Sequence, residues 1–221
     1  MSGRRFSVGA GRLLAGVAWV VLLLGLWLWG RDIPGLRTGL SAPTTGDVAA
    51  VGRPLGVARP NAVRPLAAAP PRRVEIPALR VRAPVVGRGL DRDGAIEPPS
   101  YDTPDTVAWY DRGVTPGAAG TALLVAHVDT ETGPAVFSRL GGMRPGQRIR
   151  VLREDGRTAE FTVDDVRVFA RDRFDAQKAY GPRLAGRAEL RLITCGGAFD
   201  RAEHRYTANV VVSAYLSGVG A

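Results

Sequence analysis

The sequence predicts a mostly antiparallel β-barrel or β-sandwich, and three observations favour this fold class. Short runs that alternate apolar and polar residues recur between turn signals, which is typical of half-buried strands. Helical periodicity is scarce, and the sequence lacks the strand–helix–strand spacing that builds a parallel sheet. The pair Asp155-Gly156 separates two alternating runs, and Asp-Gly in that position is a strong hairpin signal.

Ahead of this domain, three arginines precede an uncharged run of 18 residues at positions 13–30. That length is at the lower limit for a membrane-spanning helix, and two tryptophans lie at its far end, where interfacial aromatics are expected. The rival prediction is a cleaved signal peptide, but the residues after Gly30 lack a small-x-small cleavage site. We therefore expect a single-pass anchor in the cell membrane, with residues 1–12 in the cytoplasm and the rest of the chain extracellular.

Residues 31–72 are expected to form a disordered extracellular linker. They contain seven prolines, scattered glycines and no aromatic residue, and such a composition buries too little apolar surface to fold. Their arginines would either rest on anionic lipid or wall polymer, or be solvated charges on a spacer.

The charge distribution argues against a nucleic-acid partner. The formal net charge is +9, but residues 1–73 hold ten basic and two acidic residues, whereas residues 74–221 hold twenty and nineteen. A nucleic-acid-binding domain usually carries its basic excess on the folded part. The nearly neutral domain predicted here does not, so we expect no nucleic-acid partner.

The folded domain is expected over residues 73–221. Its first strands are predicted at residues 74–79 and 81–86. Pro77 and Pro84 interrupt the two runs and indicate irregular or edge strands, because proline cannot donate to a β-ladder.

A loop rich in Pro, Gly and Asp is expected at residues 97–118, with Trp109 and Tyr110 as aromatic anchors into the core. Residues 120–126 follow as a short apolar run bounded by turn signals, which is consistent with a buried strand. This strand ends at His127.

The middle of the domain is predicted to be a series of strands. Residues 134–140 can form one or two helical turns. Strands are then expected at residues 148–153, 157–163 and 166–170, and the pair Asp164-Asp165 separates the last two.

The C-terminal part is predicted to be a pair of strands. After a loop at residues 171–188, an alternating run at residues 190–194 reads as a strand that ends at Cys195. The Gly-Gly pair that follows indicates a sharp turn. A polar loop then leads to a valine-rich strand at residues 206–215.

Cys195 is the only cysteine of the chain, so no intramolecular disulfide forms. A single cysteine in an extracellular domain is either a reactive thiol or a buried, inert one. A nucleophilic cysteine reacts as its thiolate, and its leaving group needs a proton, which a histidine within reach can supply. His127 follows a buried strand as Cys195 does, and two strand ends can meet at one rim of a barrel. The alternative for His127 is a structural histidine, and His204 is expected to be an exposed loop residue.

Arg205 begins the strand after the cysteine loop. A guanidinium in that place could stabilise the anion that forms when a thiolate attacks a carbonyl.

Three motifs in this order and spacing resemble the sortases, the membrane-anchored cysteine transpeptidases of Gram-positive bacteria. Residues 192–195 (LITC) resemble the sortase L-x-T-C signature, and Arg205, ten residues later, resembles the sortase arginine. The strand that ends at His127 resembles the strand bearing the sortase histidine. The stretches AHVDT, GPAVFSRL and ITCGGAFD are most similar to the class F branch of actinobacteria, with class E next.

The resemblance implies a closed eight-stranded β-barrel with short helices. It also implies that Cys195 attacks the Thr–Gly carbonyl of an LPxTG-like sorting signal on a secreted protein, forming a thioester. His127 would protonate the leaving amine, Arg205 would hold the substrate and its oxyanion, and Thr194 would help to orient the site. An amine of a cell-wall precursor, or a pilin lysine, would resolve the thioester. No cofactor is implied, and the acidic residues do not cluster at a calcium-loop spacing, so we expect no metal site.

Three other classes of protein are the alternatives. Papain-like wall hydrolases place the cysteine before the histidine, the reverse of the order here. L,D-transpeptidases carry the cysteine in a His-Gly-Cys type motif that this sequence lacks. The non-enzyme alternative is a tethered extracellular binding module with a buried, non-catalytic cysteine.

Overall fold

The computed structural model describes residues 58–220. The expected cytoplasmic segment at residues 1–12, the expected anchor at residues 13–30 and most of the expected linker lie outside the described residues. Within the described range, none of the helices has the length and apolar character needed to span a bilayer.

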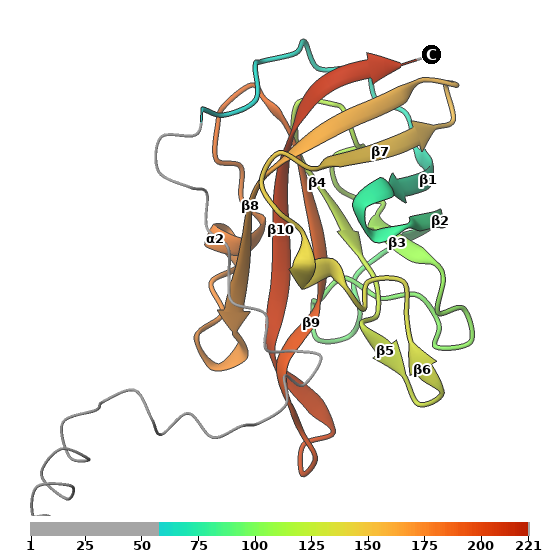
Figure 1. The fold of residues 1–221 in the computed structure, drawn as a ribbon, viewed down its shortest axis with the longest axis vertical. Coiled ribbons are helices and arrows are strands. Elements are labelled where there is room, and N and C mark those ends of the chain that lie inside the picture. The colour runs from blue at the N-terminus through green and yellow to red at the C-terminus, as the bar shows by residue number, and fades with distance from the viewer. Residues whose placement is uncertain (1–57, 221) are drawn as a thin grey trace, which may run out of the picture. The chain divides into compact units, whose positions relative to one another are not determined.

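Eight strands close into a barrel, which confirms the mostly-β fold class and the closed eight-stranded architecture implied by the resemblance (Figure 1). In order around the barrel they are β1 (Pro71–Ile76), β2 (Val81–Arg88), β3 (Val107–Tyr110), β4 (Gly120–Val125), β9 (Ala188–Asp200), β10 (Arg205–Gly220), β8 (Thr158–Ala170) and β7 (Arg148–Arg153). Two further short strands, β5 (Asp129–Thr130) and β6 (Gly133–Pro134), form a separate two-stranded sheet.

Two neighbouring pairs in the barrel are parallel, β2 with β3 and β4 with β9, while the other pairs are antiparallel. In the β4–β9 pair, Val125 lies opposite Ile193. Because the two strands run in the same direction, both leave the barrel at the same end. His127 and Cys195 each lie two residues beyond this pair, so both are found at the same end of the paired segments.

The two faces of β9 have different surroundings, because successive side chains of a strand point to opposite faces. Leu190 and Leu192 point into the barrel and are fully buried in its main apolar core. Burial of a leucine side chain contributes about 1.5–3 kcal/mol. Ile193 points outward and packs with Val211 in a second, smaller cluster that includes residues of the β8–β9 connection. Cys195 shares the outward direction of Ile193.

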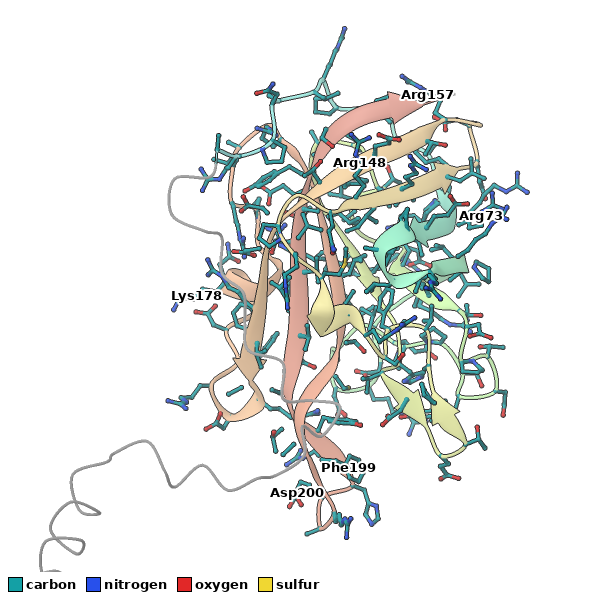
Figure 2. The ribbon with its side chains drawn as sticks, in the orientation of Figure 1. Arg73, Arg148, Arg157, Lys178, Phe199 and Asp200 are labelled. Carbon is teal, nitrogen blue, oxygen red and sulfur yellow. The ribbon has the colours of Figure 1, made fainter. Side chains whose placement is uncertain are left out.

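The expected sharp turn after the cysteine is wrong, because β9 continues to Asp200. The strand instead forms a bulge directly after Gly196. Tyr206 pairs with Phe199 and Ala208 with Gly196, so the two residues of β9 between these pairs, Gly197 and Ala198, face one residue of β10. Gly197 has a φ of +78°, which favours glycine. The hairpin turn comes after Asp200, and Figure 2 shows Phe199 and Asp200 near its tip.

The expected break at Asp164-Asp165 is also wrong. β8 is one strand from Thr158 to Ala170, and Asp164 is the extra residue of a second bulge, since Asp165 pairs with Ser213 and Val163 with Ala214. The guanidinium of Arg183 lies 2.8 Å from the Asp165 carboxylate, which explains how an acidic residue is accommodated in a buried strand.

The prolines near the start of the domain do not mark edge strands, because the barrel is closed. Pro77 begins a 3-10 turn, η1 (Pro77–Leu79), and Pro84 lies within β2 opposite Arg73. The expected loop at residues 97–118 contains the short strand β3, whose Trp109 is buried.

Within residues 58–220, helical structure is limited to short segments. Where one or two helical turns were expected, the chain forms β6 and then the 3-10 turn η2 (Leu140–Gly142). The expected loop before β9 contains the 3-10 turn η3 (Arg171–Arg173) and the helix α2 (Ala176–Tyr180). The Asp175 side chain caps α2 by accepting a hydrogen bond from the Lys178 amide at 3.0 Å.

Residues 58–70 were expected to belong to the linker, and they form no strand or helix. They nevertheless pack against the barrel: Leu66 is buried in the core, and its amide donates to the Gly117 carbonyl at 2.8 Å. The buried guanidinium of Arg153 donates to the Ala67 carbonyl. The packed part of the chain therefore begins before Arg73, the first residue of the expected domain.

Candidate active site

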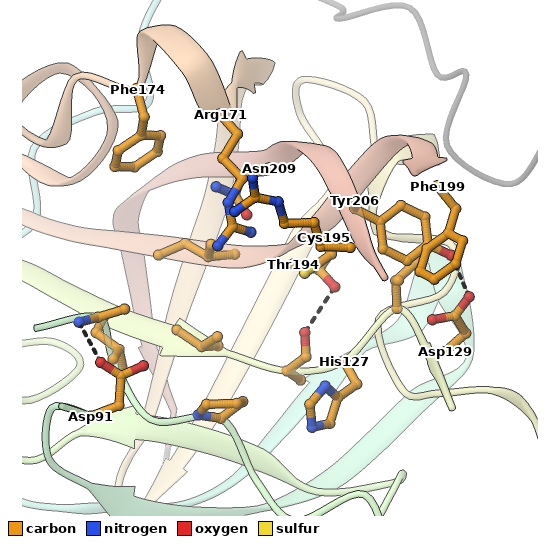
Figure 3. A pocket seen from close by; sticks show the side chains of 18 of the residues that line it. Asp91, His127, Asp129, Arg171, Phe174, Thr194, Cys195, Phe199, Tyr206 and Asn209 are labelled. Atoms are coloured by element: carbon orange, nitrogen blue, oxygen red, sulfur yellow. Dashed lines mark hydrogen bonds between the residues drawn. The ribbon is translucent and has the colours of Figure 1, made fainter. Parts of the chain in front are cut away.

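A cavity of about 610 Å³ lies on the outer face of the sheet formed by β4, β9 and β10. All four site residues expected from the sequence line it: Cys195, His127, Arg205 and Thr194. Figure 3 shows Cys195, His127 and Thr194. Phe174 and Tyr180, from the β8–β9 connection, form part of its wall. The barrel thus brings together residues that are up to 78 positions apart in the sequence.

Cys195 is partly exposed and lies in β9 opposite Asn209 of β10. The next residue, Gly196, is the last paired residue before the bulge. A Cβ atom there would lie 2.6 Å from the Val210 side chain, so β10 approaches the backbone beside the thiol too closely for any residue but glycine.

His127 is buried, with 8% of its surface exposed. Its Nε2 lies 2.7 Å from the Pro99 carbonyl oxygen. A carbonyl can only accept a hydrogen bond, so Nε2 carries a proton and Nδ1 is the nitrogen left for proton exchange. The Tyr101 ring stacks on the imidazole with centroids 4.1 Å apart and planes inclined at 19°. These two contacts fix the plane of the ring.

Thr194 ties the cysteine strand to the histidine segment. Its buried hydroxyl donates to the Ala126 carbonyl at 2.8 Å, and the Ala126 amide donates to the Ile193 carbonyl at 3.2 Å (Figure 3). These bonds join the residue before His127 to the residues just before Cys195. Thr194 therefore positions the two segments relative to each other.

Arg205 begins β10, as expected, and its side chain is 52% exposed. Its Nη2 lies 2.8 Å from a carboxylate oxygen of Glu203. Exposed ion pairs of this kind contribute at most about 1 kcal/mol. A substrate that offers a better acceptor could therefore draw the guanidinium away at little cost.

Several polar residues of the cavity were not expected from the sequence. The Tyr206 hydroxyl donates to the Asp129 carboxylate across the cavity wall (Figure 3). Their positions offered a signal, since each lies within two residues of an expected site residue. Arg171 was missed because it lies in a segment that the sequence marks only as a loop. His204 is exposed as expected, but it also lines the cavity.

The electrostatic environment favours a neutral thiol in the resting state. Burial raises the pKa of Cys195, the positive charge of Arg171 opposes that rise, and the negative charge of Asp129 adds to it. The pKa of Tyr206 is raised, first by burial and then by the hydrogen bond that its hydroxyl donates to Asp129. The Tyr206 hydroxyl therefore stays protonated and keeps the Asp129 carboxylate engaged.

Among the described residues, no group of three or more His, Cys, Asp or Glu side chains is arranged to hold a metal ion. The cavity instead offers a thiol, an imidazole with one free nitrogen, and guanidinium groups. These are the components of acyl transfer through a thioester.

Comparison with known proteins gives one family. A family model described as a sortase domain matches residues 74–217, and no curated protein matches the chain. Similar solved structures include sortase C1 of Streptococcus agalactiae (20% identity, 65% of each chain covered, TM-score 0.50). Another is sortase C1 of Streptococcus suis (18% identity, 66% of this chain and 72% of that chain, TM-score 0.50). A third is sortase C-1 of Actinomyces oris (20% identity, 65% and 70% covered, TM-score 0.49). The chain thus spans about 65% of the Streptococcus agalactiae structure, and at these identities the structural likeness concerns the fold.

Proposed function

The chain belongs to the sortase family of cysteine transpeptidases, and we propose that it cleaves an LPxTG-like sorting signal between Thr and Gly. The acyl group then passes through a thioester on Cys195 to an amine of a cell-wall precursor. Its protein substrates are secreted proteins that carry the signal at their C-terminus.

The observation that carries this proposal is the parallel register of β4 and β9. Val125 pairs with Ile193, and both His127 and Cys195 lie two residues beyond that pair. Side chains two residues apart in extended chain point to the same face. The imidazole and the thiol thus share one face and one cavity, which a Cys–His acyl-transfer pair requires.

In the first half of the reaction, the Cys195 thiol passes its proton to Nδ1 of His127, and the resulting thiolate attacks the carbonyl carbon of the substrate threonine. A C–S bond forms and the carbonyl electron pair moves to oxygen, which becomes an oxyanion. The oxyanion then collapses, the Thr–Gly C–N bond breaks, and His127 gives its proton to the departing glycine amine. A thioester and a neutral imidazole remain.

In the second half, the amine of the cell-wall precursor attacks the thioester carbonyl and gives up a proton to His127. A new C–N bond forms and the C–S bond breaks, which restores the thiolate and the imidazolium. Arg205 stabilises the oxyanion in both halves, because its guanidinium lines the same cavity and its ion-pair partner among the described residues, Glu203, is exposed.

The wall of the cavity fits an extended peptide with apolar residues ahead of the threonine. It combines the aliphatic side chains of Ile96, Val125 and Ile193 with the rings of Phe174 and Tyr180. Clefts of several hundred Å³ with apolar walls and few polar groups are typical of binding sites for small ligands and peptides.

We also propose the single-pass topology, with residues 13–30 as anchor and the barrel outside the cell. In this arrangement the enzyme meets secreted substrates and wall precursors at the membrane surface. Class F, with class E next, is the proposed subclass, and the host is a Gram-positive actinobacterium. Protease added to intact, wall-stripped cells should remove the barrel; complete protection would refute the topology.

The catalytic test incubates the purified full-length chain with an LPxTG peptide and an amine. Mass spectrometry should detect the acyl group on Cys195 and the peptide joined to the amine. Cys195→Ala should form neither. A hydrolysed peptide without any amine adduct would favour a cell-wall cysteine hydrolase. A thiol that forms no acyl adduct with any sorting peptide would favour the binding module.

A further inference from the structure

The cavity is lined by two arginines, and they come from different elements. Arg205 begins β10, whereas Arg171 is the first residue of η3, directly after β8. Figure 3 shows the Arg171 side chain extending toward Asn209 and Cys195.

The strand register places Arg171 on the same face as the thiol. Phe169 of β8 pairs with Asn209 of β10, and Asn209 pairs with Cys195 of β9, so these three residues form one row across the sheet. Side chains in one row point to the same face, and residues two apart along a strand share that face. Ala170, between Phe169 and Arg171, is in the extended conformation. Arg171 therefore leaves β8 on the face that holds Cys195.

The two arginines differ in their ion-pair partners. Arg205 pairs with Glu203 at 2.8 Å, whereas Arg171 forms no ion pair with another described residue. The neighbouring Arg173 also has a partner, since its guanidinium lies 3.6 Å from the Asp172 carboxylate. Arg171 is thus a cavity arginine whose charge no carboxylate in the described part of the chain neutralises.

Charges of both signs act on the Cys195 sulfur. Burial raises the pKa of Cys195, Arg171 lowers it, and Asp129 raises it further. Among the described residues, seven other titratable groups line the cavity: His127 after β4, Tyr180 of α2, Tyr206 and Arg205 of β10, and Asp91, Tyr101 and His204 of the flanking loops.

We propose that Arg171 is a second cationic residue of the active site, which stabilises the Cys195 thiolate while Arg205 serves the carbonyl oxygen of the substrate. The division of roles between the two arginines rests on the proposed transpeptidase function, whereas the action of Arg171 on the sulfur does not.

The experiment measures the rate at which iodoacetamide, a neutral reagent, alkylates the full-length chain as a function of pH. Cys195 is the sole cysteine, so the rate reports its thiolate alone. Arg171→Ala should move the midpoint of the profile to higher pH and slow alkylation at pH 7 by about three- to tenfold, because one pKa unit changes the thiolate fraction tenfold. Arg171→Lys keeps the charge and should retain most of the rate. Arg173→Ala is the matched control from the same turn and should follow the wild type.

Three outcomes would overturn the proposal. These are an unchanged profile in Arg171→Ala, an equal shift in Arg173→Ala, or a larger shift in Arg205→Ala than in Arg171→Ala. Arg171 is exposed, so its replacement should leave the circular dichroism spectrum intact. The measurement needs no sorting peptide, so its result stands even if the wild type transfers no peptide.

Discussion

Gly197, in the bulge between Cys195 and the hairpin tip, allows a sharp test of how the site is built. Gly197→Ala introduces two separate penalties. At a φ of +78° any Cβ is strained, and the added atom would lie 2.6 Å from the Thr207 hydroxyl oxygen and 3.0 Å from the Ala208 Cβ. Gly94 has the same φ of +78°, but a Cβ added there would meet no atom within 4 Å, so Gly94→Ala carries the strain alone.

The strain at a left-handed φ costs about 1 kcal/mol after the loss of unfolded-state entropy is allowed for. Overpacking adds about 1–3 kcal/mol at Gly197, because the neighbours are the paired backbone and short side chains of β10. A chain of this size loses roughly 2–4 °C in Tm per kcal/mol. In thermal unfolding followed by circular dichroism, the loss of Tm in Gly197→Ala should therefore be about two to four times the loss in Gly94→Ala. Gly197→Ala should also lose peptide transfer, because the bulge sets where β10 begins. Equal losses of Tm in the two variants would refute the idea that close approach of β10 requires this glycine.

Three further predictions concern the site. Thr194→Val removes the hydroxyl that donates a hydrogen bond to the buried Ala126 carbonyl. This variant should lose about 1–3 kcal/mol in the free energy of unfolding and should have a lower kcat. Denaturant titration of Thr194→Val and Thr194→Ser checks this. Arg205→Ala should lower kcat about 10²–10³-fold and Arg205→Lys less, whereas the loop control Arg201→Ala should stay within a few-fold in steady-state transfer of a fluorescent peptide. Because burial raises the pKa of Cys195, alkylation by iodoacetamide should quicken with rising pH and reach its midpoint above that of a free cysteine; a midpoint below it would contradict the assigned environment.

The parts of the fold that the sequence predicted well are those set by local alternation. The apolar run before His127 and the alternating run before Cys195 are both barrel strands, and the Asp155-Gly156 pair does separate β7 from β8. The parallel pairing of β4 with β9 was not predictable in this way, because it joins strands that are distant in the sequence. That pairing is nevertheless what brings the two site residues together.

The wrong predictions have a common physical cause. Asp164-Asp165 and the glycines after Cys195 have the composition of turns, but both pairs lie at bulges of long strands. A bulge uses turn-like residues without reversing the chain, and only the partner strand distinguishes the two. Arg171 escaped notice for a related reason: its place beside the thiol depends on the rows across β8, β10 and β9, which no local pattern encodes.

The segment ahead of β1 gives the barrel a particular response to mechanical load. A pull on the N-terminal side of residue 58 would act first on the Pro60 carbonyl, which accepts a hydrogen bond from Arg187 at 3.0 Å. It would act next on the contacts of Leu66 with Gly117 and of Ala67 with Arg153. These contacts lie one after another along an irregular segment, so they would break one at a time. Each break would let the segment ahead of β1 extend a little further. The backbone hydrogen bonds of β1 with β2 and β7 would bear force only after the segment ahead of β1 is fully extended. Tension applied from the N-terminal side would thus be absorbed in residues 58–70, and the geometry around Cys195 would be unchanged.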